Sequence, residues 1–163
     1  MKTAVFLDGN YLFYCAKDID ITIDYDNLVD SLLGNNDEVL FAKFYTGIED
    51  PCNENQQRFL KWMNHNGYRV GTKPIKINPE GVKSCNLRSN MSADICFTHG
   101  SWDKVLIIGG DEDFAYAAKR VRGIGKRVEV AAFQASLSSR LKFECDKFIP
   151  LDEMAIMFTK AIS

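Results

Sequence analysis

The sequence lacks the features that mark disulfide-rich, secreted and membrane-spanning proteins. Its five cysteines are odd in number and scattered without a C-x-x-C pair, so they indicate neither a disulfide framework nor a zinc knuckle. No apolar run approaches the roughly 18 residues that a membrane span requires. The opening stretch MKTAVFLDGN reaches an acid too early for a signal peptide or an anchor. We therefore expect reduced thiols, a cytoplasmic location and no membrane partner.

Internal repeats, low-complexity stretches and Pro- or Ser-rich linkers are also missing. The length of 163 residues and the apolar content of 46% suit one globular core, so we expect residues 1–163 to form a single domain. Apolar runs alternate with amphipathic segments along the whole chain. This alternation is typical of an α/β fold with a mainly parallel central sheet.

The apolar pattern also predicts the individual elements. Strands are expected at 3–7, 39–45, 68–72, 105–108 and 128–132. Helices are expected from Asp24 or Asp26 to Gly34, from Asp50-Pro51 to Gly67, at 91–98, at 112–124, near 137–143 and from about Asp152. The stretch 73–90 has two prolines and little periodicity, which predicts a long loop or a short hairpin beside the sheet. We regard this stretch as a candidate contact for a homodimer or for RNA.

The charge of the chain is unevenly distributed. A net charge of −2 argues against a protein that coats nucleic acid through charge alone. Residues 115–142, however, carry seven basic side chains and one acid. This segment is either a phosphate-facing surface or a solvated helix face. From it we take Lys119, Arg122 and Lys126 as candidate substrate-binding residues.

Acidic residues follow the two most apolar predicted strands. Asp8 comes directly after AVFL, and Asp111 and Asp113 follow VLIIGG. Parallel α/β sheets bind ligands at the carboxyl ends of their strands, so these acids converge if the two strands are neighbours. Asp94, in the surroundings NMSADICF, is the candidate fourth acid. Clustered carboxylates raise one another's pKa unless a cation neutralises them, and oxygen ligands suit Mg²⁺ or Mn²⁺.

Such an ion can activate water for attack on a phosphodiester, so the acids predict metal-dependent hydrolysis. Each residue also has a simpler explanation. Asp8 and Asn10 could shape a strand-to-helix turn, and Asp111 could cap the next helix. The convergence of the whole set favours the metal site. We expect the nearby Tyr11, Phe13 and Tyr14 to pack in the core, with one stacking aromatic as the alternative.

Three segments resemble the NYN domain (LabA-like) group of the PIN-like nuclease superfamily. FLDGNYLF is similar to the family's strand followed by D-x-N, and IIGGDEDFAYAAKRVRGIGKRVEVAAF resembles its S-G-D-x-D-F strand, helix and closing strand. CDKFIPLDE is similar to its final segment. The resemblance implies a three-layer Rossmann-like (PIN-like) α/β domain that hydrolyses RNA with Mg or Mn. It further implies that metal-binding or catalytic roles fall to Asp8, Asp94, Asp111 and Asp113, and that Asn10 orients the substrate.

The sequence departs from the family pattern around the middle acid. Met91 and Ser92 stand where the family often has lysine and glycine, and Thr98-His99-Gly100 ends the predicted helix early. These departures support a second hypothesis, a non-catalytic RNA-binding or regulatory module that retains a degenerate acidic pocket.

Overall fold

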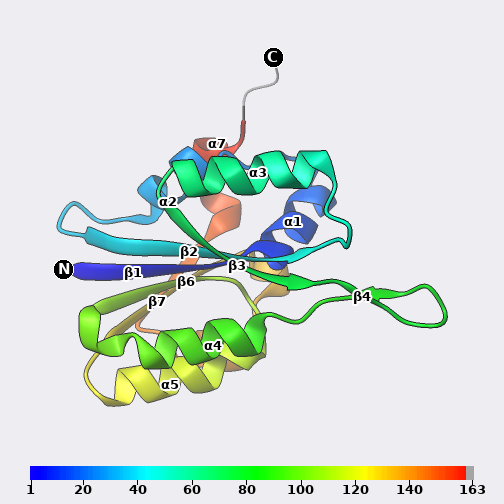
Figure 1. The fold of residues 1–163 in the computed structure, drawn as a ribbon. Coiled ribbons are helices and arrows are strands. Elements are labelled where there is room, and N and C mark those ends of the chain that lie inside the picture. The colour runs from blue at the N-terminus through cyan, green and yellow to red at the C-terminus, as the bar shows by residue number, and fades with distance from the viewer. Residues whose placement is uncertain (161–163) are drawn as a thin grey trace.

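The computed structural model describes residues 1–160 and contains a central sheet of six parallel strands (Figure 1). The strands are β1 (Lys2–Asp8), β2 (Glu38–Ile48), β3 (Tyr68–Pro74), β6 (Lys104–Ile108), β7 (Arg127–Ala132) and β8 (Lys147–Pro150). Their order across the sheet is β3-β2-β1-β6-β7-β8, the doubly wound order of Rossmann-like folds. The expected α/β class with a mainly parallel sheet is confirmed.

Helices cover both faces of the sheet and complete three layers (Figure 1). One face carries α1 (Gly9–Asp18), α2 (Tyr25–Leu32), α3 (Glu54–His65) and α7 (Ala155–Phe158). The other carries α4 (Arg88–Phe97), α5 (Ala115–Gly123) and α6 (Ser139–Phe143). Short 3-10 helices span His99–Ser101, Glu112–Phe114, Gln134–Ser136 and Leu151–Met154. None of the helices within residues 1–160 has the length and apolarity needed to cross a membrane.

The central strand β1 is buried on both faces, which explains its unbroken apolar sequence. Val5 and Leu7 belong to the core beneath α1, α2 and α3, whereas Ala4 and Phe6 belong to the core beneath α4 and α5. This alternation follows from the two-residue period of a strand. The next residue in the series, Asp8, therefore leaves the sheet on the α4 and α5 side.

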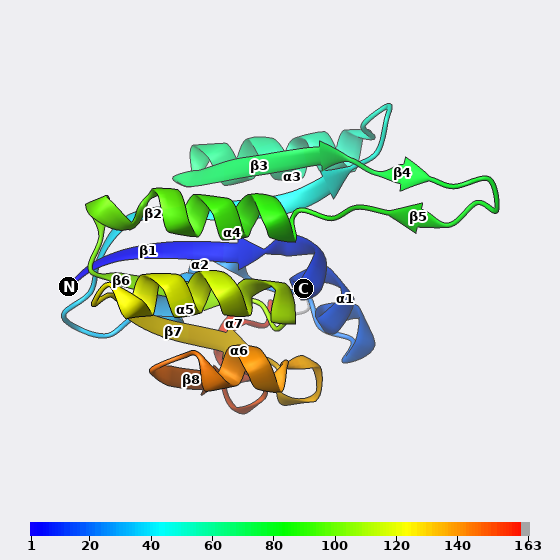
Figure 2. The same cartoon turned by 90° about the horizontal axis from the view of Figure 1, so that it is seen from below.

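Helices α3 and α4 begin at other residues than predicted, and the stretch between them contains the short hairpin that was one of its two expected structures. Helix α3 begins at Glu54 rather than at Asp50-Pro51, because Asn53 caps it by accepting a hydrogen bond from the Gln56 backbone N–H at 2.8 Å. Within 73–90, the strands β4 (Lys76–Ile77) and β5 (Lys83–Ser84) form an antiparallel hairpin. Helix α4 then begins at Arg88, three residues before the predicted start at Met91. Figure 2 shows the hairpin projecting beyond the carboxyl ends of the strands.

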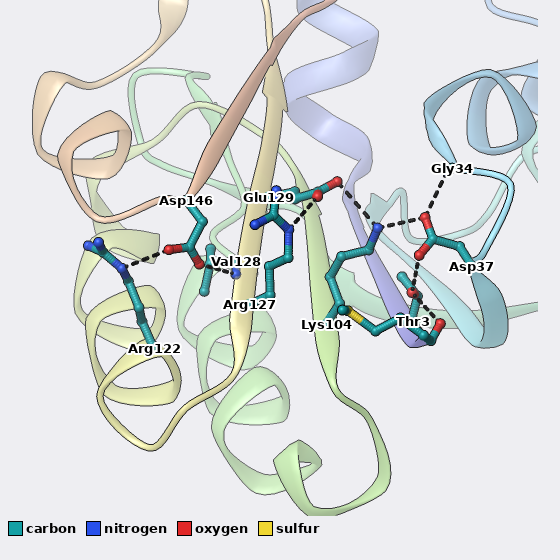
Figure 3. Close-up of polar contacts among 10 residues, drawn as sticks. Thr3, Gly34, Asp37, Lys104, Arg122, Arg127, Val128, Glu129 and Asp146 are labelled. Carbon is teal, nitrogen blue, oxygen red and sulfur yellow. Dashed lines mark hydrogen bonds and ion pairs between the residues drawn. The ribbon is translucent and has the colours of Figure 1, made fainter.

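An ion network centred on the buried side chain of Lys104 lies at the opposite, amino-terminal edge of the sheet (Figure 3). Lys104 Nζ lies 2.6 Å from Asp37 Oδ2 and 3.4 Å from Glu129 Oε1. Arg127 Nε completes the network at 2.8 Å from Glu129 Oε2, and the Thr3 hydroxyl donates to Asp37 Oδ1 at 3.2 Å. We call these five residues the amino-edge cluster. Its members come from four segments around neighbouring strands, so it ties the sheet together at this end.

Candidate functional site

Asp8 and Asp111 lie together where β1 and β6 end. The two strands are neighbours, with Leu7 paired to Ile108. The chain after β6 passes very close to Asp8, since a Cβ placed on Gly109 would lie 3.2 Å from the Cβ of Asp8. The helices that follow the two strands cover opposite faces of the sheet. The acids therefore lie at the switch point of the strand order, where doubly wound folds bind their ligands.

Asp8 is a helix cap as well as a site acid. Its Oδ1 accepts a hydrogen bond from the Tyr11 backbone N–H at 3.2 Å, so Asp8 rather than Asn10 caps α1. Only 9% of the residue is exposed. Burial raises the pKa of Asp8, and the charge of Asp111 raises it further, while the Tyr11 hydrogen bond and the Arg88 charge act in the opposite direction. A cation beside Asp8 would stabilise its ionised form.

Asp111 and Asp113 are bridged by an arginine that the sequence pattern did not single out. Arg88 Nε lies 2.9 Å from Asp113 Oδ2 and 3.4 Å from Asp111 Oδ2. Asp111 also caps the following 3-10 helix, because its Oδ1 accepts from the Asp113 backbone N–H at 2.9 Å. Arg88 was missed because it falls at the end of the stretch without periodicity, where α4 begins. We call Asp8, Asp111, Asp113 and Arg88 the carboxyl-edge cluster.

The structure does not bring Asp94 into this cluster. Asp94 Oδ2 lies 2.9 Å from Lys43 Nζ and accepts a hydrogen bond from the Tyr45 hydroxyl. It lines a separate small pocket between α4 and β2. Asp94 follows Arg88 by six residues, which places it roughly 9 Å farther along the helix axis. An acid in these small and apolar surroundings is therefore explained by its contacts with Lys43 and Tyr45, and not by convergence with Asp8 and Asp111.

Asn10 lies at the pocket, but its side chain also has a structural partner. Its Oδ1 accepts a hydrogen bond from the Gly47 backbone N–H at 3.2 Å, which ties α1 to the end of β2. This contact fixes the wall of the pocket next to Asp8. A role in orienting substrate stays a prediction.

The three basic residues expected to bind substrate do not line the pocket that contains Asp8 and Asp111. Arg122 pairs with Asp146 at 3.1 Å, and Lys126 Nζ donates to the Trp102 carbonyl at 2.8 Å near the start of β6. Lys119 is exposed on α5. Three of the seven basic residues of 115–142, Lys119, Arg120 and Arg122, lie on α5 outside the pocket, as the solvated-face alternative predicts, whereas Arg140 of the same stretch lines the pocket.

Other basic side chains surround the site. A pocket of about 1880 Å³ extends from Asp8 and Asp111 along α1 to the β4–β5 hairpin. Its basic lining residues are Lys17, Lys73, Lys76, Lys83, Arg88, Arg140 and Lys160. They outnumber the five acids of the same lining, Asp8, Asp18, Glu49, Asp111 and Glu112. The pocket is therefore net positive in a chain whose overall charge is negative. Sequence position alone gave no signal for this gathering, since the hairpin lies far from α1 in the chain.

Exposed aromatic rings lie on the α1 wall of the same pocket. Phe13 is 62% exposed and Tyr14 is 65% exposed, and their rings meet edge to face at 5.7 Å. Core packing was the wrong expectation for these two residues. It holds better for Tyr11, whose half-buried hydroxyl accepts from the Phe133 backbone N–H at 3.0 Å. Proteins that bind single-stranded nucleic acid combine basic side chains with exposed aromatic rings, on which the bases stack.

The residues at this site do not fit the four-acid metal centre that the resemblance implies. Within residues 1–160, no three His, Cys, Asp or Glu side chains are placed to hold one ion. Asp94 is engaged elsewhere, and the guanidinium of Arg88 already lies between Asp111 and Asp113. Arginine stays protonated in proteins, so this positive charge is a fixed part of the site.

Comparisons with known proteins agree on the fold. The family model described as NYN domain matches residues 2–152. The low amplitude and bright protein LabA of Synechococcus elongatus is 25% identical over 166 residues, covering 98% of this chain and 88% of LabA. A crystal structure of a Vibrio parahaemolyticus protein of unknown function superposes with a TM-score of 0.81 at 22% identity, covering 98% of this chain and 96% of the other.

Proposed function

Because the chain belongs to the NYN domain family, which has the PIN-like nuclease fold, we propose that it binds RNA in the pocket at the carboxyl ends of β1 and β6. One observation carries the proposal. The pocket combines a net positive lining with two exposed aromatic rings, beside the ligand-binding edge of the sheet. Basic side chains attract the phosphates of a strand, and aromatic rings stack on its bases.

Each wall of the pocket has a separate role in this proposal. The end of β3 contributes Lys73, and the β4–β5 hairpin contributes Lys76 and Lys83. These lysines would follow the RNA backbone, and Lys83 would exchange its exposed pairing with Glu49, at 3.1 Å, for a phosphate. Helix α1 contributes Phe13 and Tyr14, which would each offer a face to an unpaired base. An unpaired base is required, because the bases of a duplex are already stacked on one another. The proposed ligand is therefore single-stranded RNA. Dimerisation through the hairpin stays a prediction.

Metal-dependent ribonuclease activity is the second candidate. Nucleases of this fold generally use divalent metal ions. Asp8 favours this candidate, because its buried carboxylate lies beside Asp111 and forms no ion pair with a lysine or arginine among residues 1–160. Mg or Mn would be the ions suited to such oxygen ligands. The carboxyl-edge cluster supports RNA binding more directly than turnover, since its positive charge is supplied by Arg88.

RNA binding is tested with a labelled single-stranded RNA in EDTA, followed by fluorescence anisotropy. Tyr14→Ala should weaken binding about tenfold, because stacking on one base is worth about 1–3 kcal/mol. Lys76→Ala should weaken binding and reduce its salt dependence. Lys119→Ala is the matched control and should leave the affinity unchanged, because Lys119 lies outside the pocket. Equal affinities for all four proteins, or no binding by the unmodified chain, would overturn the proposal.

Cleavage is tested with the same RNA in Mg²⁺ and in Mn²⁺. The RNA-binding proposal expects the strand to stay intact. Cleavage that disappears in both Asp8→Asn and Asp111→Asn would establish the second candidate instead.

A further inference from the structure

We infer that Arg88 acts as the resident cation of the carboxyl-edge cluster, and that it excludes divalent metal ions while binding an RNA phosphate. The inference rests on the proposed function only for the identity of the phosphate ligand. Its other half, the exclusion of metal, depends on the residues of the cluster alone.

The backbone holds Arg88 in position for this role. It is the first residue of α4, and its N–H donates to the Asn86 side-chain oxygen at 2.9 Å. Figure 2 shows this end of α4 beside the carboxyl ends of the strands. The side chain therefore starts next to the acids and needs no loop movement to reach them.

The charge of Arg88 is felt by all three acids. It forms ion pairs with Asp111 and Asp113, and it lowers the pKa of Asp8, against the larger effect of burial. A divalent ion entering between these carboxylates would meet a guanidinium that cannot lose its proton. To bind, the ion would have to displace Arg88 from two ion pairs and hold it away from the site.

Few carboxylate oxygens remain for a metal ion. Asp8 Oδ1 and Asp111 Oδ1 accept the backbone N–H groups of Tyr11 and Asp113. Asp111 Oδ2 and Asp113 Oδ2 face Arg88. Mg²⁺ demands near-ideal octahedral geometry, and oxygens already held by these hydrogen bonds and ion pairs are not free to move into it.

Arg88 keeps the capacity to bind phosphate while it neutralises the acids. Among the three nitrogen atoms of the guanidinium, only Nε forms a hydrogen bond with the part of the chain that the structure describes. The guanidinium carries five N–H donors in a planar fork, so the Nη groups are available to phosphate oxygens. The side chain is 37% exposed and lines the large pocket.

The decisive measurement is Mn²⁺ binding, followed by the electron paramagnetic resonance signal of the free ion. The unmodified chain should bind Mn²⁺ weakly, and Arg88→Gln, which removes the charge but keeps most of the length, should bind it at least tenfold more tightly. Arg88→Lys keeps the charge and should stay weak. Arg122→Gln is the matched control, because Arg122 also pairs with an exposed acid but lies outside the pocket. Adding Asp111→Asn to Arg88→Gln should abolish the gain.

Equal Mn²⁺ affinity in the unmodified chain and Arg88→Gln, with an unchanged melting temperature, would overturn the exclusion of metal. RNA binding in EDTA tests the phosphate half, because Arg88→Gln should weaken it severalfold while Arg122→Gln should not. A chain that fails to bind RNA, yet gains Mn²⁺ affinity through Arg88→Gln, would disprove the proposed function and support metal exclusion. A chain that binds RNA, but gains no Mn²⁺ affinity through Arg88→Gln, would support the proposed function and disprove metal exclusion.

Discussion

At the amino ends of the strands, Lys104 lies between Asp37 and Glu129, and at the carboxyl ends Arg88 lies between Asp111 and Asp113. Both clusters place one cationic side chain among acids. Their exposure differs sharply, because the Lys104 side chain is 7% exposed and the Arg88 side chain is 37% exposed.

This difference separates a structural network from a binding site. Buried charges depend on their partners, because water cannot replace a lost one. Exposed ion pairs contribute little to stability, because water solvates the separated charges almost as well. The amino-edge cluster should therefore fix the fold, whereas the carboxyl-edge cluster can exchange its partners for a ligand.

Removing Lys104 should have the largest effect on stability. Lys104→Met leaves two nearly buried carboxylates without their shared cation, which should lower the free energy of unfolding by about 3–5 kcal/mol. Urea denaturation measures the loss. Lys61→Met on the exposed surface of α3 is the control and should stay within about 0.5 kcal/mol. Equal midpoints for the two variants would show that the amino-edge cluster contributes nothing.

Asp37→Asn should cost less, and its cost should depend on pH. Burial raises the pKa of Asp37, but hydrogen bonds from Lys104 and Gly34 outweigh burial, so the pKa is lowered overall. A lowered pKa adds stability above the unfolded value of about 3.9, and this stability is lost as the pH falls through the folded value. We expect a loss of about 2 kcal/mol at pH 7 that shrinks below pH 4. A loss that stays constant from pH 7 to pH 3 would contradict this explanation.

The two clusters also differ in how much of them could be predicted from the sequence. Asp8 and Asp111 were predictable, because an acid after an unbroken apolar strand marks the carboxyl end of a buried parallel strand. The ion pair that holds Asp94 away from these acids was not predictable, because its partner Lys43 lies 51 residues away in the chain. The position of Arg88 was hidden for a related reason. It depends on where α4 begins, and the preceding stretch has no periodicity from which to place that start.

The two edges of the sheet also differ in what a pattern can reveal. The amino-edge cluster joins residues as far apart as Asp37, Lys104 and Glu129, each of which looks like an ordinary surface charge in sequence. Strand register brings them together, since Lys104 pairs with Thr3 in β1. A pattern within one helix or strand predicts which of its faces is buried. Predicting an ion pair between elements also requires the order of the strands in the sheet.

Asp8→Asn should stabilise the chain slightly at neutral pH. The pKa of Asp8 is raised, mainly by burial, so ionisation of this carboxyl destabilises the fold. The destabilisation grows as the pH rises through the folded pKa and is complete above it. Asparagine still caps α1 by accepting the Tyr11 N–H. We expect a gain of about 1 kcal/mol at pH 7 that vanishes in acid, as followed by thermal unfolding. The control is Asp24→Asn at the cap of α2, where no such gain is expected; a loss of stability in Asp8→Asn at pH 7 would refute the desolvation argument.

Arg88→Gln should have the smallest effect on stability, although it is expected to change metal binding most. Its acidic partners are 36% and 50% exposed, so water can solvate them once the guanidinium is gone. We expect a change of about 0.5 kcal/mol, further reduced in high salt because salt screens exposed pairs. Urea denaturation at two salt concentrations, beside Lys104→Met, measures the contrast. A loss as large as that of Lys104→Met would mean that Arg88 is a structural residue and cannot leave the acids to hold a phosphate.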